Sequence, residues 1–313
     1  MVSPLSAQRS LFSFPTLTKQ KMNYPSEFSW TSKDNKKIYA KDWQVKNEDG
    51  TATDIKAVIC LIHGLGEHLH RYEHFAAYFN QKKYVVISFD HYGHGKSGGI
   101  RGHVPSFQTH MTNVAELLSQ AEERYPLLPK FLYGHSMGGN IAMNYALRNS
   151  PNIAGIATSG TWVTLPKPPS AILVGLARML KTILPTTQQS NELDPNNVSS
   201  DQDEVQKYIN DPLVHDKITF KAATEMLDAA KYLETYEGPI NIPALLMHGS
   251  EDKLTSPNGS SRLYQNLKGD LAYKSWNGFY HEIHNEPQKQ DVFDLTYKWM
   301  ESKIIVWMKN REG

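Results

Sequence analysis

The sequence predicts an α/β fold, in which helices cover both faces of a mostly parallel sheet. Runs of consecutive apolar residues, typical of strands buried on both faces, alternate with segments that carry apolar residues at helical spacing. A chain of 313 residues also suits one large α/β domain with an insertion better than two independent domains. The expected strands lie at 57–62, 84–89, 130–133, 154–158, 244–248 and 271–276.

A hairpin is expected ahead of these strands, because residues 27–30 and 37–43 alternate polar and apolar side chains around Asp34 and Asn35. The expected helices lie near 71–82, 106–125, 137–149, 258–267 and 289–308.

The alternation breaks between residues 161 and 236, where prolines and short helical pieces replace strands. We therefore expect a core at 27–160 and 237–313, with a helical lid insertion at 161–236. An insertion at this point of the chain would lie over the carboxyl ends of the strands, where open α/β sheets bind their ligands.

The composition argues against several partners. The net charge is +1 and the basic residues are spread along the chain, so the sequence shows no basic cluster of the kind that binds nucleic acid. Cys60 is the single cysteine, so no internal disulfide forms, and a reducing compartment such as the cytoplasm is expected. No run approaches the roughly 18 to 20 apolar residues that span a bilayer, so any membrane contact would be peripheral. The oligomeric state is not predicted.

Residues 1–26 contain no acidic residue and are rich in Ser, Thr, Gln and Pro. This composition fits a targeting segment, but a disordered tail is the preferred interpretation.

Residues 131–139 carry the main functional motif. An apolar run leads into Gly134-His135-Ser136-Met137-Gly138, and a helical segment follows. This strand, serine and helix pattern predicts a nucleophile elbow, where a sharp turn exposes a serine hydroxyl to a base and to oxyanion-binding N–H groups. Glycines two positions either side of Ser136 leave room for the tight crossing.

Two later loops supply the partners of a catalytic triad. Asp252 follows the strand at 244–248, and His281 follows the strand at 271–276. The order Ser, Asp, His fits a hydrolase in which His281 accepts the serine proton and Asp252 orients the imidazole. Glu251 and His284 remain alternatives for the acid and the base.

An oxyanion hole needs two N–H donors. Met137 begins the helix after the nucleophile, where the helix dipole favours negative charge. Leu65, in the His63-Gly64-Leu65-Gly66 turn after the strand at 57–62, is the expected second donor, although such a turn also serves simple chain reversal.

These motifs together resemble the monoacylglycerol lipase and lysophospholipase branch of the α/β-hydrolases, the serine aminopeptidase S33 or Hydrolase-4 type. The resemblance covers residues 28–308. It rests on residues 63–68, 71–72, 89–97, 134–139, 210–213, 248–252, 280–281 and 284–286. The α/β-hydrolase fold is therefore expected.

The resemblance implies that Glu67, Arg71 and His284 lie near a small polar pocket for the alcohol part of the substrate, and that Tyr208 lines the same region. The spacing of Glu67 and Arg71 also fits an ordinary helix ion pair.

The segment 170–184 is an apolar helix interrupted by Arg178 and Lys181. Ile172, Leu176 and Leu180 are its expected substrate-facing residues, and the helix could also dip into a lipid interface or merely cover the sheet. Burying ten methylenes is worth up to roughly 8 kcal/mol, against about 1 kcal/mol for each neutral polar contact. An apolar lid therefore favours fatty acyl substrates.

The leading hypothesis is a serine esterase that cleaves monoacylglycerol to fatty acid and glycerol through an acyl-enzyme. A lysophospholipase, a short-chain esterase or an aminopeptidase of the same fold are the alternatives, and a non-catalytic binding protein is disfavoured because the triad is complete. No cofactor is expected. Histidines 70, 74, 91 and 94 make a metal site conceivable, but no carboxylate pattern accompanies them.

Overall fold

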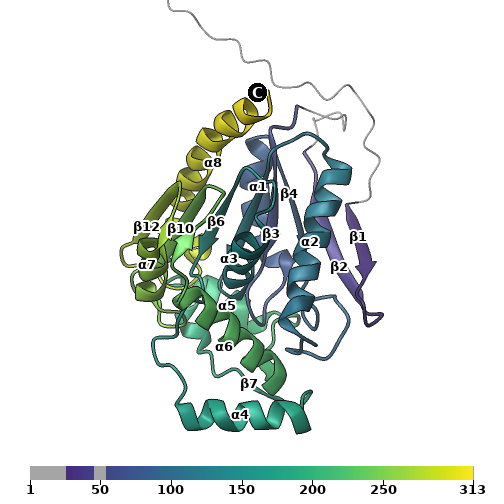
Figure 1. The fold of residues 1–313 in the computed structure, drawn as a ribbon, viewed down its shortest axis with the longest axis vertical. Coiled ribbons are helices and arrows are strands. Elements are labelled where there is room, and N and C mark those ends of the chain that lie inside the picture. The colour runs from purple at the N-terminus through teal and green to yellow at the C-terminus, as the bar shows by residue number, and fades with distance from the viewer. Residues whose placement is uncertain (1–25, 46–53, 313) are drawn as a thin grey trace, which may run out of the picture.

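The structure, a computed structural model, describes residues 26–45 and 54–312. A single sheet dominates this part of the chain, with eight strands in the order β1-β2-β4-β3-β5-β6-β10-β12 (Figure 1). The strands are β1 (Glu27–Thr31), β2 (Lys37–Trp43), β3 (Ala57–Ile62), β4 (Tyr84–Phe89), β5 (Lys130–His135), β6 (Gly155–Ser159), β10 (Ala244–Gly249) and β12 (Leu271–Trp276). The α/β fold predicted from the sequence is confirmed.

Strand direction follows the predicted pattern. β1 pairs antiparallel with β2, as the hairpin prediction requires, and β2 also pairs antiparallel with β4. All pairings from β4 through to β12 are parallel. The carboxyl ends of these parallel strands therefore meet at one edge of the sheet, which is where open α/β sheets carry their sites.

Two hydrophobic cores lie on opposite faces of the sheet. In β3, Val58, Cys60 and Ile62 belong to one core, whereas Ala57, Ile59 and Leu61 belong to the other. This division follows from the alternation of side chains along a strand. Every residue of β3 is buried, so the continuous apolar run indicated burial on both faces correctly.

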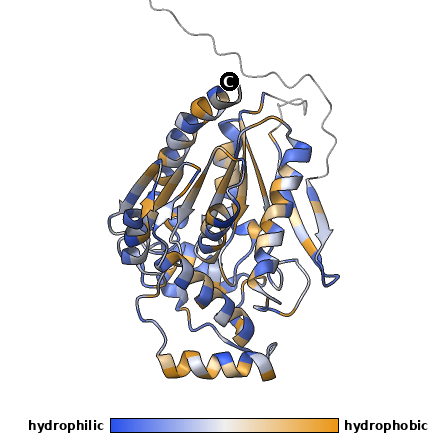
Figure 2. Ribbon diagram, in the orientation of Figure 1, coloured by the Kyte–Doolittle hydropathy of each residue, from blue (hydrophilic) through white to orange (hydrophobic). Residues whose placement is uncertain are grey.

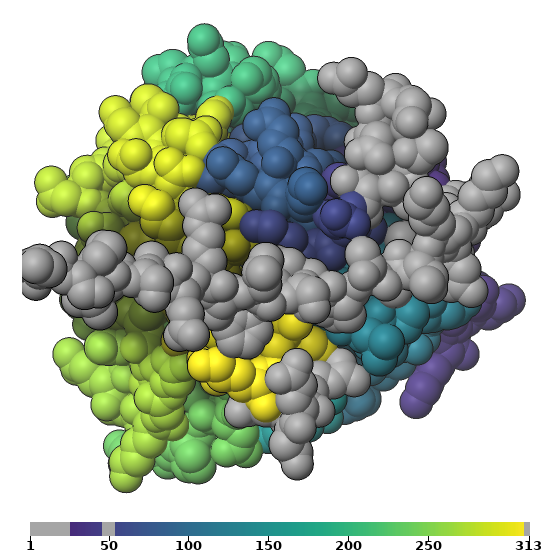
Figure 3. Space-filling model, turned by 90° about the horizontal axis from the view of Figure 1, so that it is seen from above, coloured from purple at the N-terminus to yellow at the C-terminus, as the bar shows by residue number. Residues whose placement is uncertain are grey.

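Helices cover both faces. On one face lie α1 (Glu73–Gln81) and α8 (Lys289–Glu312), which are far apart in sequence but joined by the rings of Tyr78 and Phe293, 5.3 Å apart. Figure 3 shows the yellow C-terminal surface beside blue residues of this region. On the other face lie α2 (Phe107–Arg124), α3 (Met137–Asn149) and α7 (Pro257–Asn266).

The segment 161–236 forms α4 (Ala171–Ile183), α5 (Gln202–Asn210) and α6 (Phe220–Glu234), with a short antiparallel strand pair of β7 (Gln188–Ser190) and β8 (Lys217–Thr219). The sequence pattern did not reveal this strand pair, because three-residue strands are too short to show a period. Met226, Ala230 and Leu233 of α6 join the main core, whereas α4 has no buried residue. In Figure 1, α4 lies at the far end of the molecule from α8.

The remaining elements are short. A pair of two-residue strands, β9 (Gly238–Pro239) and β11 (Leu267–Lys268), pairs parallel, and three 3₁₀ turns occur at Leu69–Tyr72, Pro195–Asn197 and Ile283–Asn285 within the described residues. The predicted tail at residues 1–26 lies outside the described residues except for Ser26. Within residues 26–45 and 54–312, no helix has the length and apolar character needed to cross a bilayer.

Candidate active site

Ser136 occupies a strained turn between β5 and α3. Its φ of 54° and ψ of −116° lie in a region that non-glycine residues rarely adopt, which costs on the order of 1 to 3 kcal/mol. Three backbone hydrogen bonds hold the turn. The Ser136 N–H donates to Ser159 O at 2.9 Å, and the Ser136 carbonyl accepts from the N–H groups of Asn140 and Trp162.

The flanking glycines are required by close backbone contacts, as the motif predicts. A Cβ on Gly134 would lie 2.5 Å from the carbonyl oxygen of Gly138, and a Cβ on Gly138 would lie 2.1 Å from that of Ile62. Any side chain at either position would push α3 away from β3 and β5, and the turn at Ser136 would open.

Asp252 and His281 meet at the carboxyl edge of the sheet. Asp252 follows β10 and His281 follows β12, and the His281 Nδ1 lies 2.7 Å from the Asp252 Oδ2. Both side chains are about 95% buried. Of the alternatives that the sequence left open, Glu251 is exposed, and its carboxylate accepts from the Ser250 hydroxyl. No hydrogen bond or ion pair joins His284 to Asp252 among the described residues. The geometry therefore favours the Asp252 and His281 pair.

The charges of this pair stabilise one another. Burial raises the pKa of the Asp252 carboxyl, but the facing His281 and His248 outweigh this effect and hold the pKa below its usual range. Burial lowers the pKa of His281, but Asp252 outweighs it and keeps that pKa above its ordinary value. The low dielectric of the site strengthens both interactions.

His281 lies beside the nucleophile turn. Its ring is 4.7 Å, between centroids, from that of His135, the residue before Ser136. A Cβ on Gly160 would lie 3.1 Å from His281 Nδ1, and Gly160 follows Ser159, which accepts the Ser136 N–H. No hydrogen bond joins Ser136 Oγ to His281 in the described part of the chain. Catalytic contacts of this kind often tighten only with substrate.

Leu65 and Met137, the residues expected to supply the two oxyanion donors, both line one small cavity, which Ser136 itself does not line. The loop that carries Leu65 also lies against the nucleophile, since a Cβ on Gly64 would be 3.3 Å from the Ser136 Cβ. Met137 begins α3, where backbone N–H groups lack intrahelical partners. The structure thus brings together the two residues that the sequence analysis paired.

Glu67 and Arg71 form a buried ion pair, with 2.8 Å between Arg71 Nη1 and Glu67 Oε2. The sequence analysis missed a third member, Glu282, which accepts from both Arg71 Nη1 and Nη2 at 2.6 and 2.7 Å. The Arg71 guanidinium also lies 4.7 Å from the centre of the Tyr208 ring. Three of the four residues that the resemblance assigned to the alcohol pocket are therefore in contact.

Burial and competition for Arg71 give the two carboxyls different pKa values. Burial raises the pKa of Glu67, and neighbouring Glu282 adds to this, although Arg71 opposes both. Burial also favours a higher pKa for Glu282, but the charge of Arg71 outweighs burial and lowers the pKa of Glu282 to about 2. The adjacency of Glu282 to His281 was the one sequence signal that could have identified this residue.

His284 lies in a buried aromatic stack rather than on an open surface. Its ring centroid is 4.8 Å from that of Tyr72 and 4.7 Å from that of His135. Burial holds its pKa well below the ordinary value, with His135 and His74 as further causes. His284 is therefore a neutral ring that packs against His135, the residue before Ser136.

The histidines singled out as conceivable metal ligands have other partners or surroundings. His70 bonds Tyr39 and Glu73, and His74 bonds the His284 carbonyl. His91 and His94 belong to a buried ring cluster with His63 and His110. In the part of the chain that the structure describes, no group of three or more His, Cys, Asp or Glu side chains is arranged to hold a metal ion.

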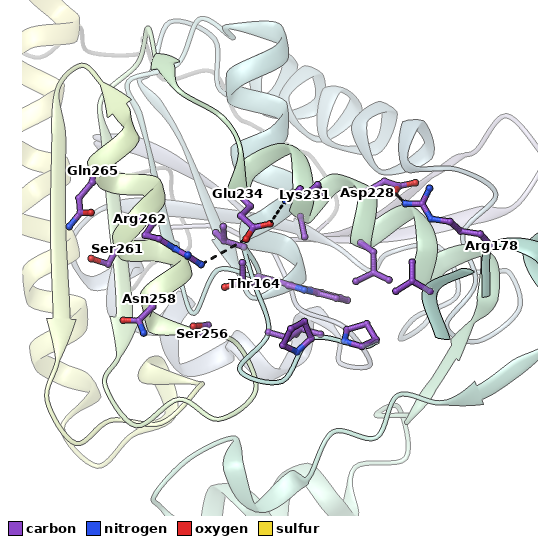
Figure 4. A pocket seen from close by; sticks show the side chains of 18 residues that line it. Thr164, Arg178, Asp228, Lys231, Glu234, Ser256, Asn258, Ser261, Arg262 and Gln265 are labelled. Atoms are coloured by element: carbon purple, nitrogen blue, oxygen red, sulfur yellow. Dashed lines mark hydrogen bonds and ion pairs between the residues drawn. The ribbon is translucent and has the colours of Figure 1, made fainter. Parts of the chain in front are cut away.

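A cavity of about 750 Å³ lies between α4, α6 and α7 (Figure 4). Its apolar lining includes Trp162, Val163 and Leu227, and its charged groups are paired, Arg178 with Asp228 and Glu234 with Lys231 and Arg262. Ser136, Asp252 and His281 do not line it. One lining residue connects the cavity to the nucleophile turn, because the Trp162 N–H donates to the Ser136 carbonyl at 3.1 Å.

The apolar face of α4 points away from this cavity. Val174 and Arg178 line the cavity, whereas Ile172, Leu176 and Leu180 do not. Ile172 is 85% exposed and Leu176 is 46% exposed, and Figure 2 shows α4 as a hydrophobic helix at the edge of the molecule. The sequence located the apolar helix but could not give its rotation.

The fold and the turn at Ser136 define the protein as an α/β-hydrolase, a class in which strand, serine turn and helix occur in this order. The family model of the serine aminopeptidase S33 type matches residues 53–288, and the chain belongs to this family. The family resemblance found in the sequence is thereby confirmed.

Similar proteins include enzymes with lipid substrates in their names. A monoacylglycerol lipase of Mycolicibacterium smegmatis is 33% identical over 254 residues, which are 80% of this chain and 90% of that protein. An uncharacterized abhydrolase domain-containing protein of Dictyostelium discoideum is 35% identical over 79% of this chain, but this chain spans only 26% of its length.

Among solved structures, the crystal structure of the monoacylglycerol lipase of Paleococcus ferrophilus is 34% identical to this chain. It aligns with a TM-score of 0.73 over 85% of this chain and 99% of that chain.

The buried histidines predict an acid-sensitive fold. Burial lowers the pKa of His110 and of His135 to about 3, with neighbouring His94 and His281 as further causes. Their unfolded value is about 6.5, so the unfolded state binds more protons between those limits. The stability they provide is complete above pH 6.5 and is lost as the pH falls towards 3.

We expect the free energy of unfolding, measured by urea titration, to fall from pH 7 to pH 5. Each titrating histidine contributes a slope of up to about 1.4 kcal/mol per pH unit. His110→Phe, which cannot take up a proton, should make the slope shallower. An unchanged free energy of unfolding between pH 7 and pH 5 would contradict this prediction.

Proposed function

We propose that this protein is a carboxylic ester hydrolase that cleaves monoacylglycerols into fatty acid and glycerol through an acyl-enzyme on Ser136. The observation that carries the proposal is the 2.7 Å contact of His281 with Asp252, set beside the strained turn that presents Ser136. The names of the similar lipases add the substrate class.

In the proposed reaction, Ser136 Oγ attacks the ester carbonyl carbon while His281 Nε2 accepts the hydroxyl proton. The carbonyl oxygen becomes an oxyanion, which the N–H groups of Leu65 and Met137 stabilise. Collapse of this intermediate breaks the bond to glycerol, and His281 returns the proton to the departing alkoxide. A water molecule then repeats the sequence on the acyl-enzyme, releasing the fatty acid and restoring Ser136.

The two sides of the site suit the two parts of a monoacylglycerol. The buried Glu67, Arg71 and Glu282 cluster, capped by the Tyr208 ring, offers hydrogen-bonding groups for the alcohol. The cavity between α4, α6 and α7, whose lining includes Trp162 and Leu227, offers apolar surface for the acyl chain. A fatty chain gains more from such burial than a peptide would, since neutral polar contacts contribute only about 1 kcal/mol each.

We further propose that segment 161–236 is a lid and that the outer face of α4 contacts a lipid surface. Its exposed side chains include Ile172, Met179 and Ile183, at 85%, 55% and 68%. Contiguous apolar surface of this kind marks interaction sites on soluble proteins.

Ser136→Ala should lower the turnover of 1-oleoylglycerol at least about 10⁴-fold without lowering the melting temperature, because only the nucleophilic oxygen is removed. Ser302→Ala, on the exposed face of α8, is the matched control and should leave turnover unchanged. Turnover by Ser136→Ala within tenfold of the wild type would exclude the proposed mechanism. A parallel series with lysophosphatidylcholine, short p-nitrophenyl esters and aminoacyl anilides distinguishes the related hydrolase activities.

A double variant Ile172→Glu and Ile183→Glu should bind vesicles of phosphatidylcholine and phosphatidylserine at least about tenfold more weakly than the wild type, because two apolar anchors are lost. Hydrolysis of soluble p-nitrophenyl butyrate should be little changed. The control Ile305→Glu alters a comparably exposed residue on α8, at 56%. Equal loss of vesicle binding in both variants, or no loss in either, would contradict a specific role of α4.

A further inference from the structure

Asp252 accepts more hydrogen bonds than it needs to orient one histidine. Its Oδ2 lies 2.7 Å from His281 Nδ1, 2.9 Å from Thr255 Oγ1 and 2.9 Å from His248 Nε2. Its Oδ1 accepts from the backbone N–H groups of Leu254 and Thr255 at 2.8 and 2.9 Å. Two imidazole rings therefore share one carboxylate oxygen, and the proposed reaction uses only one of them.

The surroundings of His248 determine which of its ring nitrogens carries a proton. His248 lies in β10 and is fully buried. Its Nε2 lies 2.9 Å from Asp252 Oδ2, a carboxylate oxygen that only accepts, and 3.4 Å from both the carbonyl oxygen and the hydroxyl oxygen of Thr255. Its Nδ1 lies 2.8 Å from the hydroxyl of Ser260 in α7, which is able to donate to it. The proton must therefore be on Nε2, and His248 donates to Asp252.

We propose that His248 is a positioning residue that holds the Asp252 carboxylate and limits how strongly it attracts the proton on His281. This inference rests on the proposed function of Ser136, Asp252 and His281. In the part of the chain that the structure describes, no hydrogen bond or ion pair joins His248 to Ser136 or His281, so His248 acts through Asp252.

The direction of the effect follows from hydrogen-bond physics. A donor on Asp252 Oδ2 withdraws negative charge from that oxygen and weakens its attraction for the His281 imidazolium. Removing the donor should strengthen that attraction and raise the pKa of His281. The direction is the same whether His248 is neutral or charged, since loss of a neighbouring positive charge would also favour protonation of His281.

Other groups also face His281 and have to be held constant. The ring of His135 approaches from β5, Glu282 follows in the chain, Glu67 acts from the loop after β3, and His284 lies in the turn at Ile283–Asn285. Substitution at His248 leaves these four groups in place. Among the described groups, a change in the titration of His281 then reports on Asp252.

The first test compares His248→Met with His248→Gln. Methionine fills the space without a donor, whereas the glutamine amide retains an N–H that can reach Asp252. The readout is the acid limb of kcat/KM for p-nitrophenyl butyrate, which reports the free-enzyme pKa of the base. We expect the midpoint to move up by about 0.5 to 1 pH unit in His248→Met and to stay near the wild type in His248→Gln.

A second test needs no substitution. Nitrogen-15 NMR of the wild-type histidines should place the His248 proton on Nε2, with Nδ1 as an acceptor. A proton on Nδ1 alone, an unshifted acid limb in folded His248→Met, or equal shifts in both variants would overturn the inference. These outcomes are independent of Ser136→Ala, whose retained activity would instead overturn the proposed function itself.

Discussion

The close backbone approach at the Ser136 turn is the constraint on which the rest of the site depends. A Cβ on Gly138 would lie 2.1 Å from Ile62 O, so the first turn of α3 presses directly on the end of β3. This contact brings the loop of Leu65 against the nucleophile. The hydrogen bond from Ser136 N–H to Ser159 O ties the turn to the end of β6. Gly160, the next residue, lies against the His281 ring. One strained residue thus aligns three loops.

The buried charged groups of the site contribute to its chemistry more than to the free energy of folding. Removing ions from water costs several kcal/mol each, and well-made ion pairs roughly recover that cost. The buried cluster of Arg71 with Glu67 and Glu282 is one such arrangement, and Asp252 with His281 is another. What these contacts provide is fixed geometry, because each carboxylate is held by several donors and cannot rotate. A base that must receive a proton in one direction benefits from this rigidity.

Local patterns in the sequence predicted most of the strands and the turn at Ser136. The continuous apolar run of β3 indicated burial on both faces, and the glycines around Ser136 indicated the turn, because each feature reports a local physical requirement. The sequence contained no comparable signal for contacts between side chains that are far apart in the chain. Nothing in the spacing connects Glu282 to Arg71, 211 residues earlier, and only the strand order brings them together. The outward rotation of Ile172 likewise depends on how α4 packs against α6.

The proposed reaction depends on a hydroxyl at the Ser136 turn that His281 activates. The most direct measurement is covalent labelling of the wild-type protein with a fluorophosphonate, followed by mass spectrometry of the peptides. We expect a single adduct on Ser136 that forms progressively faster as the pH rises through the pKa of His281. Absence of an adduct under conditions where the protein is folded, or an adduct on another residue while Ser136 stays free, would contradict it.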